Sequence, residues 1–102
     1  MIRHVFLWRA AAATDPAEVV SILNELPAHV PGILSWGIGS FLEDFGKPQI
    51  AWDDGLTCEF ETPEELHTYL THPYHQDVIK RLEPLISERA ICHFEVPKAG
   101  RS

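Results

Sequence analysis

Two segments of this chain begin with the same short pattern of a capping residue, a proline and a glutamate. The first is DPAE at residues 15–18, and the second is TPEE at residues 62–65. An Asp or Thr at the N-cap, Pro at the first helical position and Glu at the third suit the free amide groups of a helix start. The sequence therefore predicts one helix that begins at residue 16 and another that begins at residue 63.

Apolar side chains follow both starts at helical spacing. The first helix is expected to end at HVPG (29–32), because Pro and Gly do not continue a helix. In the second, Pro73 interrupts or restarts the helix, which then continues through residues 73–88. The apolar positions are Val19, Ile22, Leu23 and Leu26 in the first helix, and Val78, Leu82 and Leu85 or Ile86 in the second.

Four segments around these helices have the alternation or β-forming composition of strands. A polar stretch, EDFGKPQIAWDD, is expected to be a loop at residues 43–54. The strands are expected at IRHVFLWR (2–9), ILSWGIGSFL (33–42), GLTCEFE (55–61) and RAICHFEV (89–96). The order β-α-β-β-α-β predicts an α+β fold of the ferredoxin-like type, with one antiparallel sheet covered by helices on one face.

That topology has the strand order 4-1-3-2, which separates the two cysteines. Cys58 lies on the third strand and Cys92 on the fourth, with the first strand between them. A disulfide between them is not expected, because the two side chains would be too far apart.

A length of 102 residues favours a single domain over 1–102, with a core over about 1–96 and a tail at 97–102. So short a chain cannot cover both faces of its sheet. A second sheet is the simplest cover for the remaining face, so we expect a homodimer.

The formal net charge of −7 argues against nucleic acid or an anionic membrane as a partner. No apolar run approaches the ~20 residues of a membrane span. The first ten residues alternate and lack a signal-peptide pattern, so a cytoplasmic location is expected.

The stretch YLTHPYHQDV (69–78) concentrates the candidate chemistry. Pro73 suits the first helical position, which makes His72 the N-cap and His75 the third residue of the helix. A helix N-terminus disfavours a protonated imidazole, so His75 is expected to be neutral and able to act as a general base. Tyr69 could donate its phenol to an oxyanion in the same pocket.

Structural interpretations of these residues remain open. His72 could simply cap the helix, His75 could be a solvated helix residue, and Tyr69 could be core. His4 shares a strand face with Phe6 and Trp8, where a histidine is often a core residue. Trp8 could stack on a planar ligand or fill the core.

A metal site would need His4, His72, His75 and Asp54 to converge. Their spacing matches no recognised ligand pattern, and no glycine-rich nucleotide motif opens a helix. We therefore predict neither a metal nor an organic cofactor. Asp54 could instead orient His75 or His4, as a carboxylate orients the imidazole of a triad.

Several stretches in order resemble the stress-responsive dimeric A/B barrel (Dabb) family: MIRHVFLWR, PGILSWGIG, DDGLTCEFET, YLTHPYHQDV and ICHFEV. The resemblance covers about residues 1–96 and implies a ferredoxin-like protomer that pairs its sheet with that of a second protomer. It also implies likeness to a plant polyketide cyclase of the family, which closes a tetraketide by an aldol step without a metal or organic cofactor. In that enzyme the catalytic pair corresponds to Tyr69 and His75 here.

The resemblance also implies a pocket between sheet and helices. It places His4, Leu23, Asp54, Leu56 and His72 in that pocket. The cyclase has histidine, lysine and tyrosine where this chain has Asp54, Leu34 and Leu23. These departures argue against the same substrate.

The sequence thus predicts a cofactor-independent acid–base enzyme of the isomerase, cyclase or lyase type. Its substrate would be a small, largely apolar carbonyl or phenolic molecule. The alternatives are a non-catalytic ligand-binding or stress-related dimer, and a cofactor-free monooxygenase. The candidate catalytic residues are His75 and Tyr69, and the candidate substrate-binding residues are His4, Phe6, Trp8, Leu23, Asp54, Leu56 and His72.

Overall fold

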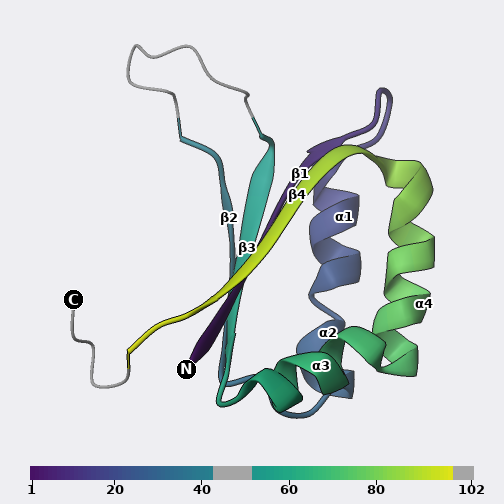
Figure 1. Ribbon diagram of the computed structural model, residues 1–102. Helices are drawn as coiled ribbons and strands as arrows, with labels where there is room; N and C mark the ends of the chain where they lie inside the picture. The colour runs from purple at the N-terminus through teal and green to yellow at the C-terminus, as the bar shows by residue number, and fades with distance from the viewer. Residues whose placement is uncertain (43–51, 98–102) are drawn as a thin grey trace.

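The alternating segment at the start of the chain forms β1 (Ile2–Ala10), an inner strand of a four-stranded antiparallel sheet (Figure 1). The computed structural model describes residues 1–42 and 52–97. Most of the loop expected at 43–54, and most of the expected tail, lie outside these residues. The other elements are α1 (Pro16–Leu23), α2 (Leu26–His29), β2 (Ser35–Ser40), β3 (Asp54–Phe60), α3 (Pro63–Thr71), α4 (Pro73–Leu82), the 3₁₀ turn η1 (Glu83–Leu85) and β4 (Ile86–Glu95).

The sheet has the order β2-β3-β1-β4, which confirms the predicted arrangement of strands. All the helices lie on one side of it (Figure 1), so the fold is the predicted α+β, ferredoxin-like one. Cys58 and Cys92 are both free and lie on β3 and β4, with β1 between them, as expected.

Alternation along β1 and β3 sorts their side chains between the two faces of the sheet. Every second residue of both strands is buried against the helices: Ile2, His4, Phe6 and Trp8 on β1, and Asp54, Leu56, Cys58 and Phe60 on β3. The helices contribute apolar residues to the same core, including Val19, Leu23, Leu26, Leu66, Tyr69, Val78 and Leu82. The core therefore lies between the sheet and the helices.

The predicted helix starts are confirmed. The Asp15 carboxylate and the Thr62 hydroxyl accept hydrogen bonds from backbone amides in the first turns of α1 and α3. His72 caps α4 in the same way, since its Nδ1 accepts a hydrogen bond from the Tyr74 amide at 3.0 Å.

The first helix is shorter than predicted. It ends at Leu23, and a separate short helix, α2, follows from Leu26. Pro27 explains the break, because it has no amide hydrogen to donate and its ring would clash with the carbonyl of Leu23 in a continuous helix.

The last helix also ends early. Pro84 lies in the 3₁₀ turn η1, and β4 begins at Ile86, three residues before the predicted start at residue 89. Pairing with β1 recruits the extra residues, since Ile86 lies opposite Ala10.

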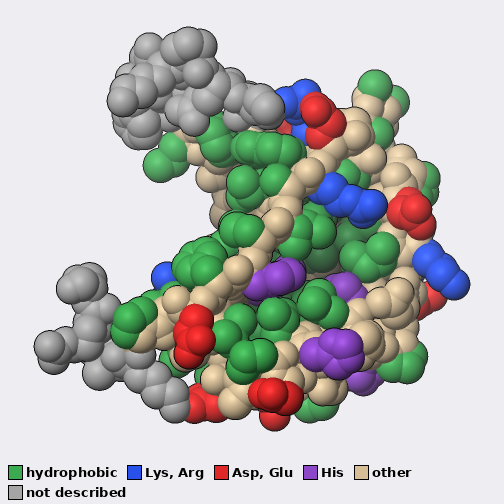
Figure 2. All heavy atoms as spheres, viewed as in Figure 1, with side chains coloured by type: hydrophobic (Ala, Val, Ile, Leu, Met, Phe, Trp, Pro, Cys, Tyr) green, Lys and Arg blue, Asp and Glu red, His purple; other side chains and the backbone are tan. Residues whose placement is uncertain are grey.

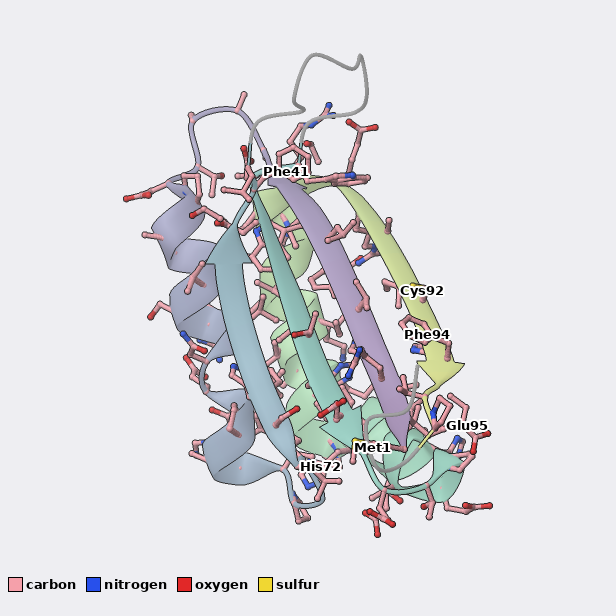
Figure 3. All side chains as sticks on the ribbon, turned by 90° about the vertical axis from the view of Figure 1, so that its left-hand side faces the viewer. Met1, Phe41, His72, Cys92, Phe94 and Glu95 are labelled. Carbon is pink, nitrogen blue, oxygen red and sulfur yellow. The ribbon has the colours of Figure 1, made fainter. Side chains whose placement is uncertain are left out.

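The sheet face turned away from the helices carries apolar side chains, and we call it the open face. Val5, Leu7, Cys92 and Phe94 lie on this face, opposite the side that β1 buries. Figure 3 views the sheet from this side, with the helices behind it. Phe94 remains 47% exposed, so the open face leaves apolar surface in contact with water.

Among the described residues, no helix is long and apolar enough to cross a membrane.

Candidate active site

A small apolar cavity of about 40 Å³ lies between the sheet and the helices. A volume of this size admits a few water molecules or a small chemical group. We call it the histidine cavity. Its lining residues are His4, Phe6, Leu23, Leu56, Tyr69, His75, Ile79 and Ile91.

The break at Pro73 brings the two central side chains of the cavity together. Tyr69 belongs to the end of α3, and His75 is the third residue of α4. Because α4 restarts after the extended residue His72, its first turn faces the last turn of α3. The Tyr69 and His75 ring centroids lie 4.5 Å apart.

His75 has the properties of a neutral base. Its side chain is buried, and burial lowers the pKa of its imidazole below the usual 6.5. The Leu70 carbonyl opposes this shift, and His72 adds to it. The direction agrees with the prediction from sequence, and the largest cause of the shift is burial.

Two buried side-chain nitrogens, Nε1 of Trp8 and Nδ1 of His75, lack a hydrogen-bond partner among the described residues. Of the two, only that of His75 belongs to a residue lining the cavity. A buried polar atom without a partner is costly, and such atoms concentrate where a water molecule or ligand supplies the missing contact.

Tyr69 complements this base as a hydrogen-bond donor. Burial, and secondarily the Cys58 thiol, raise the pKa of its phenol well above the usual value of 10. The phenol therefore stays protonated at neutral pH and can donate to an oxygen that gains negative charge.

His4 completes the polar side of the cavity, and behind it lies His93, which does not line the cavity and was not predicted from the sequence. His93 lies opposite His4 on β4, the rings are stacked with centroids 4.9 Å apart, and their Nδ1 atoms are 2.9 Å apart. Burial, His93 and His75, in that order, lower the pKa of His4 to about 4. His4 is therefore neutral at neutral pH.

Three residues in or beside the cavity were not predicted from the sequence. His93 and Ile91 lie on β4 on the helix side of the sheet, and Ile79 lies on α4. Strand register would have located His93, because the antiparallel pairing of the first and last strands places it opposite His4. The predicted topology contained the pairing but not its register.

The structure brings six of the nine candidate residues to the histidine cavity and leaves three outside it. The six are His4, Phe6, Leu23, Leu56, Tyr69 and His75. Trp8, Asp54 and His72 do not line it.

Each of these three has another environment. Trp8 is fully buried and stacks on Phe6, with ring centroids 5.2 Å apart, so it is part of the core. The imidazole of His72 is engaged in capping α4. Asp54 lies opposite Trp8, four residues along β3 from the partner of His4, which is roughly 13 Å at strand spacing. Asp54 therefore does not orient His4 in this structure, and no hydrogen bond to His75 is present among the described residues.

Within residues 1–42 and 52–97, no group of three or more His, Cys, Asp and Glu side chains is arranged to hold a metal ion. The imidazoles of the cavity lie instead against aromatic and aliphatic carbon. The arrangement offers a neutral base, a protonated phenol and a further imidazole around one apolar space. That set is suited to moving a proton at a carbon next to a carbonyl.

The chain is similar in sequence to one protein family along almost its whole length. It matches the model of the stress responsive A/B barrel domain over residues 2–96. No curated protein matches it in sequence.

Solved structures with the same fold are numerous. One is a dimeric ferredoxin-like protein of unknown function from Thermobifida fusca, with a TM-score of 0.75 and 23% identity, covering 93% of this chain and 90% of that one. Another is a hydroxynitrile lyase from Passiflora edulis, with a TM-score of 0.83 and 12% identity, covering 98% and 96%. A third is a Dabb family protein from Mesorhizobium loti, with a TM-score of 0.78 and 18% identity, covering 94% and 95%. At these identities the likeness shows the fold alone.

Proposed function

Because this chain belongs to the stress responsive A/B barrel domain family, we propose that it is a cofactor-independent enzyme that works by acid–base chemistry. Its substrate is a small, largely apolar carbonyl or phenolic molecule. The observation that carries the proposal is the contact between the buried side chains of His75 and Tyr69 in one apolar cavity, with ring centroids 4.5 Å apart.

In the proposed reaction His75 takes a proton from the carbon next to the substrate carbonyl. The electron pair of the C–H bond moves into the carbonyl, and the Tyr69 hydroxyl donates a hydrogen bond to the resulting enolate oxygen. The protonated His75 then returns its proton to another carbon in an isomerisation or to a leaving group in an elimination. In a cyclisation the enolate carbon attacks a second carbonyl of the substrate, and the alkoxide formed there takes the proton. Isomerisation, cyclisation and elimination share this first step.

The lowered pKa of His75 and the raised pKa of Tyr69 support these roles. His75 is in the form that accepts a proton at neutral pH, and Tyr69 is in the form that donates a hydrogen bond. Two titratable groups with pKa values moved apart by their surroundings are typical of acid–base sites.

We further propose that the protein is a homodimer paired through its open face. The half-buried Leu7 and the exposed Phe94 support this pairing, because apolar surface of this kind is costly in water. Structural neighbours such as the Thermobifida fusca protein are described as dimeric.

Exchange of deuterium from solvent into a panel of small ketones, followed by ¹H NMR, tests the proposed chemistry without knowledge of the product. We expect exchange at the carbon next to the carbonyl. His75→Gln should slow it at least ~100-fold, and Tyr69→Phe about 100-fold.

Matched controls replace the same residue types away from the cavity. His67 is exposed on α3, and the Tyr74 hydroxyl is bound to Glu25. His67→Gln and Tyr74→Phe should exchange like the unaltered protein. If His75→Gln and Tyr69→Phe also left exchange unchanged, the acid–base proposal would be wrong. A protein that bound the ketones without exchange would instead favour the non-catalytic, ligand-binding alternative.

A further inference from the structure

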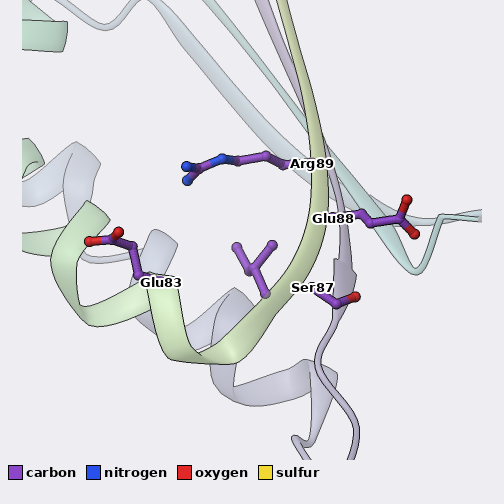
Figure 4. A pocket seen from close by; sticks show the side chains of 5 residues that line it. Glu83, Ser87, Glu88 and Arg89 are labelled. Atoms are coloured by element: carbon purple, nitrogen blue, oxygen red, sulfur yellow. The ribbon is translucent and has the colours of Figure 1, made fainter.

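A second hollow, of about 200 Å³, lies at one end of β4. It is lined by Glu83, Ile86, Ser87, Glu88 and Arg89 (Figure 4). We call it the arginine hollow. It is larger and more polar than the histidine cavity.

The two spaces follow one another between the last helix and the last strand. Ile79 lines the histidine cavity and Glu83 lines the arginine hollow, one helical turn apart. On β4, Ile91 lines the histidine cavity and Arg89 lines the arginine hollow. These two residues are two positions apart, so their side chains lie on the same side of the strand. Figure 2 shows a hollow beside β4 with histidine side chains at one end and a Lys or Arg side chain at the other.

Arg89 points its guanidinium to the helix side of the sheet. It pairs across strands with Trp8, whose side chain is buried against the helices. Glu88 projects to the opposite side of β4 (Figure 4) and forms an ion pair with Arg9. Glu88 therefore borders the hollow while its carboxylate points away from it, and the Arg89 guanidinium points toward the helix side.

The guanidinium of Arg89 has no ion pair or hydrogen bond with any residue that the structure describes. The other arginine of this region, Arg81, is held by two hydrogen bonds to Glu25. Glu83 shares the hollow with Arg89 but forms no ion pair with it among the described residues. Arg89 thus keeps its planar set of donors available, in a geometry that matches a carboxylate.

We propose that the substrate carries a carboxylate, which Arg89 binds while its carbonyl end lies in the histidine cavity. The placement of the carbonyl end depends on the proposed function, whereas the presence of a carboxylate is inferred from Arg89 alone. Ile91 and Arg89 are roughly 7 Å apart along the strand. An apolar keto acid with about four methylene groups between its carbonyl and its carboxylate spans this distance.

The carboxylate of Glu83 adds a second, testable feature to the proposed carboxylate site. Its negative charge offsets that of Arg89, so the hollow has no strong positive field of its own. An anion would be held by direct hydrogen bonds to the guanidinium and opposed by Glu83. Removal of the Glu83 charge should therefore tighten carboxylate binding.

The test compares two probes that differ only in charge, 6-oxoheptanoate and its methyl ester. Binding to the full chain is measured by ¹H–¹⁵N NMR titration at low ionic strength. We expect the unaltered protein to bind the carboxylate at least ~10-fold more tightly than the ester. Arg89→Gln should abolish this preference, and Glu83→Gln should increase it.

Lys80→Gln is the matched control, because it removes one exposed cation from α4 without touching either space. It should keep the preference. Equal binding of acid and ester, no binding of either, or a preference that survives Arg89→Gln would overturn the inference.

Deuterium exchange on the same two probes separates this inference from the proposed function. Arg89-dependent binding without exchange would sustain the carboxylate site and count against the acid–base chemistry. Equal exchange on the ester and the acid, without a preference in binding, would support the acid–base chemistry and count against the carboxylate site.

Discussion

His4 and His93 face each other across β1 and β4 with their Nδ1 atoms 2.9 Å apart. At this distance one nitrogen must carry a hydrogen and the other must accept it. Since His4 is neutral at neutral pH, the partner determines which of its two nitrogens is protonated. The contact therefore controls whether His4 offers a donor or an acceptor at Nε2.

We predict that the two rings hold opposite roles at Nδ1, one as donor and one as acceptor. Long-range ¹H–¹⁵N spectra of protein labelled in histidine report the tautomer of each ring. His93→Phe should change the tautomer populations of His4, because it removes the partner of Nδ1. The exposed His67→Phe serves as control. Unchanged His4 signals in His93→Phe would show that the pair does not set the tautomer.

Burial of His4 predicts that stability falls as the pH is lowered. Its pKa is about 4 in the folded protein and 6.5 in the unfolded chain, so the unfolded chain binds more protons between these values. The stability contribution is therefore complete above about pH 6.5 and is lost as the pH falls toward 4. The full loss is about 3 kcal/mol.

Denaturant unfolding at pH 7, 6 and 5 measures this effect above the range in which carboxylates titrate. His75, whose pKa is also lowered, acts in the same direction. His4→Phe should reduce the slope of unfolding free energy against pH, whereas His67→Gln should keep it. An unaltered slope in His4→Phe would contradict the prediction, whatever its effect on stability at pH 7.

Gly32 is predicted to be required by the backbone between α2 and β2. Its φ is +93°, and an added Cβ would lie 2.6 Å from the Glu65 carboxylate. Gly32→Ala should destabilise the protein by about 1–2 kcal/mol. Gly39 is the matched control, since a Cβ there would meet nothing within 4 Å. Equal unfolding free energies for the two alanine variants would refute the prediction.

The open face gives a prediction about assembly. Phe94→Glu places a charge on this apolar surface and should shift the protein from dimer to monomer in light scattering at micromolar concentration. Gln76→Glu adds the same charge on the exposed side of α4 and should leave a dimer. A monomeric unaltered protein would contradict the proposed homodimer.

Interactions between residues close in the chain were the ones that the sequence predicted best. The helix starts were predicted correctly, because each is marked by a capping residue next to it in the sequence. Asp15, Thr62 and His72 cap their own helices in the structure. Chain topology followed from the order of elements. The break before Pro27 could have been foreseen from proline chemistry alone.

Long-range register was harder to predict. His93 and Asp54 show this in opposite ways, since one meets His4 and the other lies far from it along the sheet. Neither relationship is visible in the spacing of residues along the chain. The candidate pair of Tyr69 and His75 was accessible because both residues belong to one continuous stretch around Pro73.

The opposite pKa shifts of His75 and Tyr69 predict an unusual pH dependence for deuterium exchange. The rate should rise with pH through the lowered pKa of His75, so its midpoint lies below 6.5. It should then stay level through pH 10, because the raised pKa of Tyr69 keeps the phenol protonated where an ordinary tyrosine ionises. His75→Gln should remove the rising limb, while His67→Gln should retain it. A midpoint above 6.5 would argue against His75 as the base, and a decline centred near pH 10 would argue that Tyr69 titrates like an exposed tyrosine.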